Sequence, residues 1–419
     1  MANAFFLSGL AANACVQAQG VTVTSEDADF PKANLQNGFP WKPFRFGDLT
    51  TNQTIEFDCN VVVNPSFETD ADGTSPPTGW TIPTGGGTPD VSTAQASEGT
   101  KSLRLNAASE AAYQDVLVVP GNTYRLSASL YGDGTDPVNA YLYDPLSGKW
   151  LNSGQSWVTT KTAWATKTPT GFTNSAINFV VEPAEDGHVG AGRLRIQFER
   201  PGSITGAAYV DSVYFYPKIT VAAIAYHTLP FAWTLLVQSD DEPTFTSPAA
   251  HGTLPANRFR TYLKFAGPSP DPHRYWRFSF EGTPVDGYRP WIGQPILGER
   301  KVMTDLPLHS TAGTLEISRM MPIAGTEDIP NAIADAYRFA LTATWRNTAT
   351  GLAQAMNEML AGCYYGVEPL LICPKDDVQR FVYGRGKSLS QVSEVDLGNG
   401  RFEYSVRLTD DQYPLRPTE

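Results

Sequence analysis

Large aromatic side chains with polar neighbours gather between residues 131 and 157 of the chain. Tyr141 and Tyr143 are two positions apart and fall on the same face of a predicted strand. Trp150 and Trp157 stand in a Ser- and Gly-rich stretch that we expect to be an exposed loop, where a large aromatic side chain needs an explanation.

Aromatic rings of this kind stack on the CH face of a pyranose, while amides and carboxylates bind its hydroxyl groups. The residues predicted to bind carbohydrate are Tyr131, Tyr141, Tyr143, Trp150, Trp157, Asn152 and Gln155, with Asn139 and Asp144 as further polar neighbours. The alternative for each single ring is that it fills the core of a sandwich, as we expect of Trp80.

Residues that would carry catalysis do not form a recognisable pattern. The paired acids Asp240-Asp241 and Asp376-Asp377 are typical of turns, because neighbours on a strand point to opposite faces. The Gly85–Gly87 stretch lacks the Lys-Ser/Thr of a phosphate loop. The histidines have neither ligand nor triad spacing: His188, His227, His251, His273 and His309. We expect a protein that is not an enzyme.

Composition narrows the class of protein further. The net charge of −12 and the pI near 5.0 argue against a nucleic-acid partner, since binding to phosphate needs a basic surface. The four cysteines are scattered, without a CxxC pair, which predicts buried free thiols. No apolar run reaches the roughly 20 residues of a membrane span. The N-terminus lacks the basic region of a signal peptide, so we expect synthesis in the cytoplasm and no membrane insertion.

Alternation of apolar and polar residues predicts strands on both sides of residues 60–217. Strands are expected at 20–24 and 54–59 before this stretch, and at 219–227, 233–241, 258–265 and 275–280 after it. Fewer than 60 residues cannot form a stable core alone, so the N-terminal strands need the later ones. This pattern predicts one domain, residues 1–59 plus 218–299, that is interrupted by a second.

Residues 60–217 resemble the jelly-roll carbohydrate-binding modules of the family 4/9/22 group. The resemblance rests on Asn64-Pro65-Ser66-Phe67-Glu68, Gly79-Trp80, Glu98-Gly99-Thr100-Lys101-Ser102-Leu103, Pro120-Gly121-Asn122-Thr123-Tyr124 and Tyr209-Val210-Asp211-Ser212-Val213. It implies a glycan ligand and a structural Ca²⁺ held by Glu68 and Asp211, with backbone carbonyls near Glu98–Lys101 as helpers. The alternative is that both acids are solvated or paired at strand ends.

The interrupted domain resembles the discoidin-like jelly rolls of certain bacteriophage tail proteins. The motifs that carry this resemblance are Ile55-Glu56-Phe57-Asp58, Ile224-Ala225-Tyr226-His227, Val237-Gln238-Ser239-Asp240-Asp241 and Arg274-Tyr275-Trp276-Arg277-Phe278. Residues 300–419 resemble, in architecture, the tail-tube-like β-sandwich with one helix, here predicted at 350–361. The expected fold is therefore mainly β, with one jelly roll inserted into another and a third domain after them.

The two resemblances together imply a structural virion protein of a phage tail tip or baseplate. We expect it to form a ring of copies, to contact other tail proteins, and to reach polysaccharide on the host surface through the inserted module. It would then reside in the virion tail. One alternative is a secreted bacterial carbohydrate-binding protein, or an accessory module of a polysaccharide-degrading system. Another is that the insert is purely structural and binds no ligand.

Overall fold

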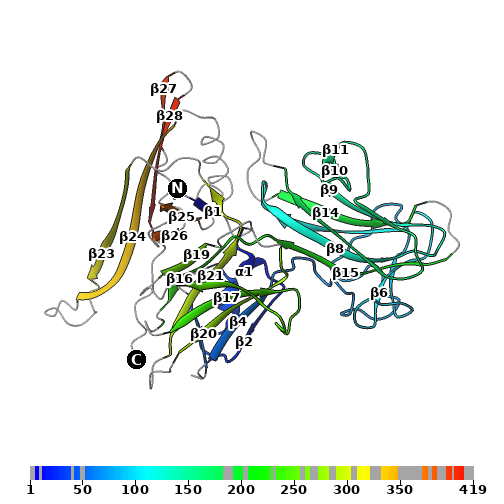
Figure 1. Cartoon of the computed structure of the whole chain (residues 1–419), viewed down its shortest axis with the longest axis horizontal. Helices are drawn as coiled ribbons and strands as arrows, with labels where there is room; N and C mark the ends of the chain where they lie inside the picture. The colour runs from blue at the N-terminus through cyan, green and yellow to red at the C-terminus, as the bar shows by residue number, and fades with distance from the viewer. Residues whose placement is uncertain are drawn as a thin grey trace.

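The computed structural model describes most of the chain (Figure 1). The described residues are 5–8, 12–38, 42–47, 52–182, 192–201, 206–227, 229, 233–254, 260–264, 272–282, 289–302, 309–320, 332–347, 370–375, 380–384, 393–398 and 401–409. The fold is mainly β, in several antiparallel sheets, as the sequence predicted. None of the helices in these ranges has the length and apolar character needed to cross a bilayer.

Residues 60–217, which we call the insert, form a sandwich of two antiparallel sheets. One sheet has the order β13-β8-β15-β6-β5 and the other the order β11-β10-β9-β14-β7, with β12 also paired to β9. The strands of the first sheet are β5 (Asp90–Ser92), β6 (Ser102–Leu105), β8 (Thr123–Tyr131), β13 (Thr173–Val180) and β15 (Ala208–Pro217). Those of the second are β7 (Ala111–Val118), β9 (Val138–Asp144), β10 (Lys149–Leu151), β11 (Trp157–Val158), β12 (Ala165–Lys167) and β14 (Gly192–Glu199).

Period-two alternation builds the core of the insert, because successive strand residues point to opposite faces. Leu126 and Leu130 of β8 and Ile196 and Phe198 of β14 are all fully buried between the sheets. Trp80 is 4% exposed and lies between Phe67 and Phe198, with ring centroids 5.4 and 5.8 Å away. The prediction that Trp80 fills the core is confirmed.

The second sandwich, which we call the host, draws its strands from both sides of the insert. One sheet has the order β18-β17-β20-β4-β2 and the other the order β19-β16-β21-β3. Its elements are α1 (Ala14–Gln17), β2 (Gly20–Val23), the 3-10 helix η2 (Lys32–Gln36), β3 (Phe44–Arg45), β4 (Asn52–Asp58), β16 (Val221–His227), β17 (Thr234–Asp240), β18 (Ala249–Leu254), β19 (Arg260–Lys264), β20 (Tyr275–Glu281) and β21 (Trp291–Gly298). Phe57 of β4 pairs with Trp276 of β20, so the predicted partnership of early and late strands is confirmed.

The two chain crossings between host and insert lie side by side. Asn60 is fully buried, and its side-chain oxygen accepts hydrogen bonds from the backbone N–H of Val62 at 3.2 Å and of Phe215 at 2.9 Å. The N–H of Val61 donates to the carbonyl of Phe215 at 2.9 Å. The start and the end of the insert are thus joined to each other, which is the geometry that tolerates an inserted domain.

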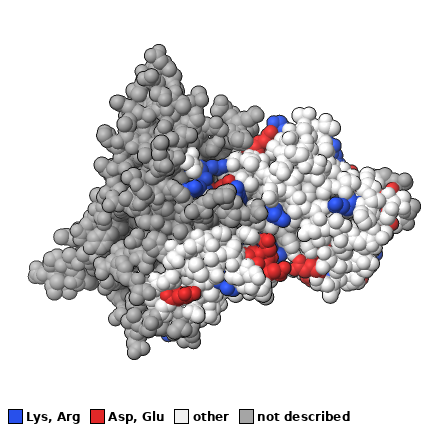
Figure 2. Space-filling model, in the orientation of Figure 1, with Lys and Arg blue, Asp and Glu red and all other residues white. Residues whose placement is uncertain are grey.

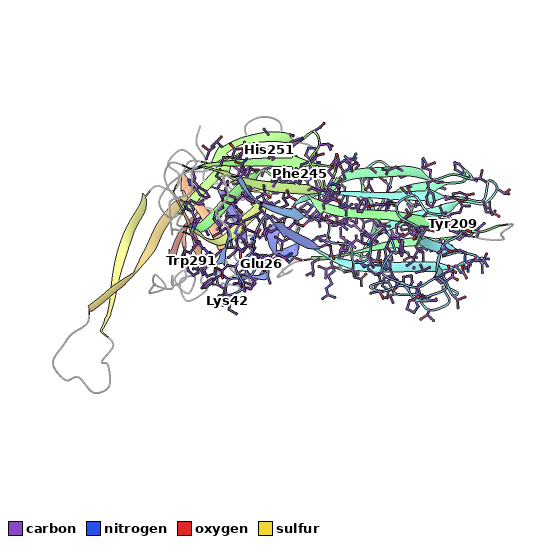
Figure 3. The ribbon with its side chains drawn as sticks, turned by 90° about the horizontal axis from the view of Figure 1, so that it is seen from below. Glu26, Lys42, Tyr209, Phe245, His251 and Trp291 are labelled. Atoms are coloured by element: carbon purple, nitrogen blue, oxygen red, sulfur yellow. The ribbon has the colours of Figure 1, made fainter. Side chains whose placement is uncertain are left out.

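Host and insert also contact each other beside these crossings. The guanidinium of Arg274 forms a two-point ion pair with Asp58 and lies 3.8 Å from the ring centroid of Tyr214. Glu299 accepts from the Thr123 backbone N–H, and from its hydroxyl at 3.0 Å. Tyr216, the last residue but one of β15, packs in the host core. In Figures 1 and 3 the insert lies at one end of the molecule, with the host beside it.

The remaining strands form two further sheets. The first has the order β22-β1-β25-β26 and the second the order β23-β24-β28-β27. Their bounds are β1 (Phe5–Ser8), β22 (Lys301–Val302), β23 (His309–Met320), β24 (Ala332–Asn347), β25 (Leu370–Lys375), β26 (Arg380–Gly384), β27 (Ser393–Gly398) and β28 (Arg401–Thr409). Gly398 of β27 pairs with Arg401 of β28, as in a hairpin. The predicted helix at 350–361 lies outside the described residues.

The first strand does not pair with the host. Phe5 to Ser8 of β1 pair with Cys373 to Leu370 of β25, so this strand belongs to a sheet made mainly from the last third of the chain. The domain boundaries at 59/60, 217/218 and 299/300 stay a prediction, as does the likeness of residues 300–419 to tail-tube-like domains. Figure 2 shows charged side chains of both signs scattered over the described surface, with uncharged areas between them.

Candidate functional site

Three of the predicted carbohydrate-binding rings meet on the outer surface of one sheet of the insert. Tyr141, which is only 8% exposed, and Tyr143 lie on the outer side of β9, because their neighbours Ala140 and Leu142 are buried in the core. The antiparallel register places Trp150 of β10 directly opposite Tyr143. The Trp150 ring lies 4.4 Å from that of Tyr143, tilted by 32°, and 5.7 Å from that of Tyr141, edge to face.

Strands β14 and β7 extend this surface with polar groups. Arg195 stands opposite Tyr143 on one side and Asp115 on the other, and Gln197 stands opposite Tyr141 and Tyr113 in the same way. A third row pairs Glu199 with Asn139. We call this surface the aromatic face; it consists of Tyr113, Asp115, Asn139, Tyr141, Tyr143, Trp150, Lys161, Arg195, Gln197 and Glu199.

Lys161 covers part of the aromatic face. Its ammonium lies 4.6 Å from the ring centroid of Tyr141 and 5.6 Å from that of Trp150, and it forms an ion pair with Glu199. Glu199 also accepts a hydrogen bond from the amide of Gln197 at 2.9 Å. A cation held over an electron-rich ring is a favourable contact, so Lys161 occupies the place that an apolar ligand surface would take.

The other end of the aromatic face is held by Arg195. Its guanidinium donates two hydrogen bonds to Asp115, at 2.8 and 3.1 Å, and lies 3.8 Å from the ring centroid of Tyr113. The hydrogen bond to Asp115, opposed by partial burial, raises the pKa of Arg195 above its ordinary value. The pair fixes a planar donor group between two tyrosines, where it can bind hydroxyl oxygens.

The structure places Trp157 and Tyr131 away from the aromatic face. Trp157 was expected in an exposed loop, but it lies in β11. It stands opposite Leu151 and, like that residue, packs against the core. Its indole N–H donates to the Val180 carbonyl at 3.0 Å. Trp150 was also expected in a loop and lies in β10. Tyr131 belongs to the other sheet, where it packs edge to face against Tyr209, labelled in Figure 3.

Asn152 and Gln155 build the tight connection between β10 and β11. The side-chain oxygen of Asn152 accepts from the N–H of Ser156 at 3.0 Å, and Gln155 has a positive φ of 63°. Asp144 does a similar task before β10, since it accepts hydrogen bonds from Leu146 and Ser147. Asn152, Gln155 and Asp144 thus position the hairpin of β10 and β11, which carries Trp150 and Trp157. They lie outside the aromatic face.

Six members of the aromatic face were not predicted. They come from strands or a loop that lacked an aromatic cluster in the sequence: Tyr113, Asp115, Lys161, Arg195, Gln197 and Glu199. The signal that would have found three of them is the alternation in β14. Leu194, Ile196 and Phe198 alternate along this strand and are buried in the core, so the positions between them face outward.

Glu68 and Asp211 both bind the segment 97–101, from its two ends. Glu68 accepts from the backbone N–H of Thr100 at 2.7 Å and of Lys101 at 2.6 Å, and Asp211 accepts from those of Ser97 at 2.6 Å and Glu98 at 2.9 Å. The groups of this segment that face the two carboxylates are therefore N–H donors, not the carbonyl oxygens predicted as calcium ligands.

This donor set does not fit a Ca²⁺ ion, which takes six to eight oxygen ligands. The ammonium of Lys101 donates to the carbonyl oxygens of Glu68 at 3.0 Å and Asp70 at 2.5 Å, so a cation of the chain itself already stands among the nearby oxygens. Within the described ranges, no three His, Cys, Asp or Glu side chains are grouped as metal ligands. The calcium site stays a prediction.

Burial raises the pKa of the Asp211 carboxyl to about 6, with the Glu98 carboxylate adding to the effect and the N–H donors of Glu98, Ser97 and Ser212 opposing it. Asp211 is fully buried, so its charge is costly unless these donors satisfy it. The segment 97–101 is thus held by a carboxyl group whose charge depends on pH in the acidic range.

Comparison with known proteins gives only distant neighbours. No protein-family model and no curated protein matches the chain. Among solved structures, the module TmCBM61 in complex with β-1,4-galactotriose is 18% identical, covers 38% of this chain and 99% of its own, and has a TM-score of 0.26. The CBM22-1 xylan-binding domain of Xyn10C from Paenibacillus barcinonensis is 19% identical over 36% of this chain and 90% of its own, with a TM-score of 0.26.

A third neighbour is the enzymatically active domain of tailspike protein 4 from bacteriophage CBA120. It is 18% identical, with a TM-score of 0.26, over 38% of this chain and 21% of its own. At such identities and scores these likenesses carry no inference about function.

Proposed function

We propose that the insert binds glycans through the aromatic face. The observation that carries this proposal is the register of β7, β14, β9 and β10, which sets aromatic rings and hydrogen-bonding side chains in adjoining rows on one outer surface. A pyranose needs this mixture, since its CH face is apolar and its rim carries hydroxyl groups. Trp150 and Tyr143 supply the stacking rings, and Arg195, Gln197 and Asn139 supply the hydrogen bonds.

The proposed binding is not coupled to cleavage. A glycosidase holds two carboxyl groups on opposite sides of the scissile bond. The carboxylates of the aromatic face are instead each held by a cation on the same surface, Asp115 by Arg195 and Glu199 by Lys161. Neither is presented across a cleft from the other, which favours a binding protein over an enzyme.

We infer further that the chain is a structural component of a phage tail tip or baseplate. In this proposal the host and the C-terminal sheets contact copies of the chain and other tail proteins, and the insert reaches surface polysaccharide of the host cell. The position of the insert at one end of the molecule suits a displayed module (Figure 1). Repeated weak contacts in a ring would gain strength by avidity. If the chain were instead a secreted bacterial carbohydrate-binding protein, it would bind polysaccharide through the same aromatic face.

Glycan-array binding of the full chain tests the binding proposal. We expect Trp150→Ala to weaken binding about 2- to 10-fold. This loss corresponds to the roughly 0.5–1.5 kcal/mol that an aromatic contact contributes. Tyr131→Ala is the matched control, because it truncates an aromatic ring on the opposite sheet. Equal binding by both variants and the unchanged chain would refute the aromatic face as the site.

The virion proposal has a separate test. Mass spectrometry of purified phage particles should detect the chain, and electron microscopy should show several copies around the tail axis. A chain that stays monomeric at high concentration and is absent from virions would exclude this role, and would leave the binding proposal untouched.

A further inference from the structure

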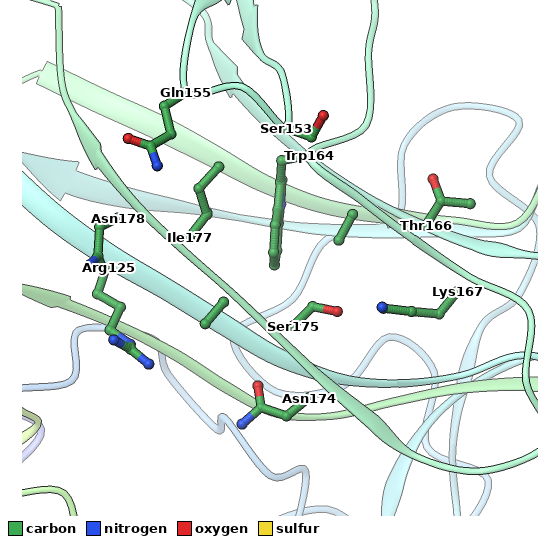
Figure 4. Close-up of a pocket in the computed structure, with 12 residues that line it drawn as sticks. Arg125, Ser153, Gln155, Trp164, Thr166, Lys167, Asn174, Ser175, Ile177 and Asn178 are labelled. Atoms are coloured by element: carbon green, nitrogen blue, oxygen red, sulfur yellow. The ribbon is translucent and has the colours of Figure 1, made fainter.

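A cavity opens at the edge of the insert, where the two sheets of the sandwich separate. Strand β13 is the last strand of one sheet, and β12 pairs only with β9 of the other. The cavity between them has a volume of about 590 Å³ and follows β13 from Asn174 to Asn178 (Figure 4). Trp164, Lys167 and Gln155 line its other side. Small-molecule sites have volumes of this order.

Buried polar atoms without a hydrogen-bond partner are concentrated around this cavity. Across the described part of the chain, eight buried side-chain nitrogen or oxygen atoms lack a partner, and four of these belong to residues that line the cavity. They are Arg125 Nε, Trp164 Nε1, Ser175 Oγ and Asn178 Oδ1. Trp164 is 5% exposed, so its N–H has little access to bulk water. Such groups are rare in folded proteins because each costs free energy, and they indicate a missing partner.

The charge of the cavity favours an anionic ligand. Arg125 and Lys167 are its charged lining residues, and no carboxylate lines it within the described ranges. Lys167 forms no ion pair with another described residue. Arg125 also interacts with Asp241 of the host, whose pKa is lowered mainly by the hydrogen bond with His273 and to a smaller extent by the charge of Arg125. In Figure 4 the Lys167 and Ser175 side chains point toward each other across the cavity. Lys167 is therefore the better anchor for a ligand anion.

We propose that this cavity is a second carbohydrate site, and that it takes a carboxylated sugar residue. The ammonium of Lys167 binds the carboxylate, while the Ser175 hydroxyl and the Trp164 N–H bind ring hydroxyl groups. The site is separate from the aromatic face and does not depend on it. The two meet only at Thr166, which lines the cavity and donates to the side-chain oxygen of Asn139 at 2.9 Å.

The test uses the full ¹⁵N-labelled chain and follows the indole N–H signal of Trp164, assigned with Trp164→Phe. The probes are trigalacturonate and its fully methyl-esterified form, which differ in charge at nearly constant shape. We expect a saturable shift of this signal with the acid only, and a weakening of about tenfold in Lys167→Met, the usual effect of losing a charged hydrogen bond. Trp150→Ala is the control and should leave this binding unchanged. Sialyllactose against lactose repeats the comparison with a second carboxylated sugar.

The proposal stands if either acidic sugar meets these conditions. It is overturned if both acids leave the Trp164 signal unmoved, if the neutral forms bind as well as the acids, or if Lys167→Met binds like the unchanged chain. Loss of acid binding in Trp150→Ala would place the ligand on the aromatic face and overturn it as well. Neutral glycans that lose binding in Trp150→Ala alone support the aromatic face independently, so the two proposals fail separately.

Discussion

Lys161 competes with any ligand for the rings of the aromatic face. Its ammonium lies over Tyr141 and Trp150, and its side chain is 41% exposed. An exposed cation–π contact contributes about 0.5–1 kcal/mol, and a surface ion pair a similar amount or less. The side chain is thus held weakly enough for a sugar ring to displace it.

We expect Lys161→Ala to strengthen binding of neutral glycans about 2- to 5-fold, because the ligand no longer displaces the ammonium. The free energy of unfolding should fall by about 0.5–2 kcal/mol, because the variant loses the cation–π contact and the ion pair with Glu199. Isothermal titration calorimetry and urea unfolding measure the two effects. Weaker binding in this variant would instead identify Lys161 as a ligand contact.

Asp211 makes the stability of the insert depend on pH. Its pKa of about 6 in the folded chain lies above the ordinary value, so the folded state takes up this proton before the unfolded state does. The contribution of this group therefore rises as the pH falls from about 7 to about 4, by up to about 3 kcal/mol. Urea unfolding across this range should show a smaller pH dependence in Asp211→Asn.

The same residue provides a test of calcium. A bound Ca²⁺ would favour the ionised carboxylate and remove this pH dependence, and it would raise the thermal midpoint at pH 7 in the unchanged chain but not in Asp211→Asn. Midpoints that do not respond to CaCl₂ or to a chelator would exclude calcium at this position.

At the scale of elements, the segment 97–101 depends on one glycine. Gly99 has a φ of +67°, and a Cβ there would stand 2.5 Å from Oε1 of Glu68, the carboxylate that holds the segment. Gly85 has a similar φ of +79°, but a Cβ there would meet nothing within 4 Å. A substitution would therefore strain the backbone similarly at both glycines. Only at Gly99 would the new side chain also collide with a neighbour.

We expect Gly99→Ala to destabilise the insert more than Gly85→Ala does. Gly85→Ala should cost about 1–2 kcal/mol, the penalty of a positive φ, and Gly99→Ala should add the loss of the Glu68 contact to the same penalty. Urea unfolding followed by tryptophan fluorescence compares them. Equal costs would show that Glu68 does not hold this segment tightly.

The sequence predicted the positions of strands that have one buried face. It did not predict which side chains lie next to each other on neighbouring strands. Alternation identified β4 and β20, because local sequence decides which residues point inward. The row formed by Asp115, Arg195, Tyr143 and Trp150 depends on the register of three strand pairs, which only the folded sheet sets.

The two tryptophans that were predicted to bind carbohydrate show the same limit. Trp150 points outward and Trp157 inward because the connection between β10 and β11 sets Trp157 opposite Leu151. Composition placed both in one exposed loop, since Ser and Gly predict a turn but not its length. If that connection were one residue longer or shorter, Trp157 would point to the outer face of the sheet and no longer to the core.

At the scale of the whole molecule, the insert is joined to the host by more than two peptide links. Arg274 bridges Asp58 of the host and the ring of Tyr214 in the insert, and Tyr216 packs in the host core. Burial alone would lower the pKa of Arg274, but the hydrogen bonds to Asp58 raise it above its ordinary value. These contacts hold the two sandwiches in one orientation.

We expect Arg274→Ala to loosen this junction, because Asp58 loses its ion-pair partner and Tyr214 its cation. Hydrogen exchange of residues 58–61 and 213–218 should become faster, while exchange in β14 should not change. Arg195→Ala, which removes an arginine from an ion pair and a tyrosine within the insert, is the matched control. Unchanged exchange at the junction would show that the chain crossings alone hold it.

The pairing of β4 also sets an order of folding. Its two neighbours are β2, which precedes it, and β20, which is made only after the whole insert. During synthesis the insert can therefore close its own core while Ile55 and Phe57 still lack their late partner strand. Slow ribosomal passage through residues 218–281 would prolong the exposure of these side chains, so the host needs protection from aggregation for longer than the insert does.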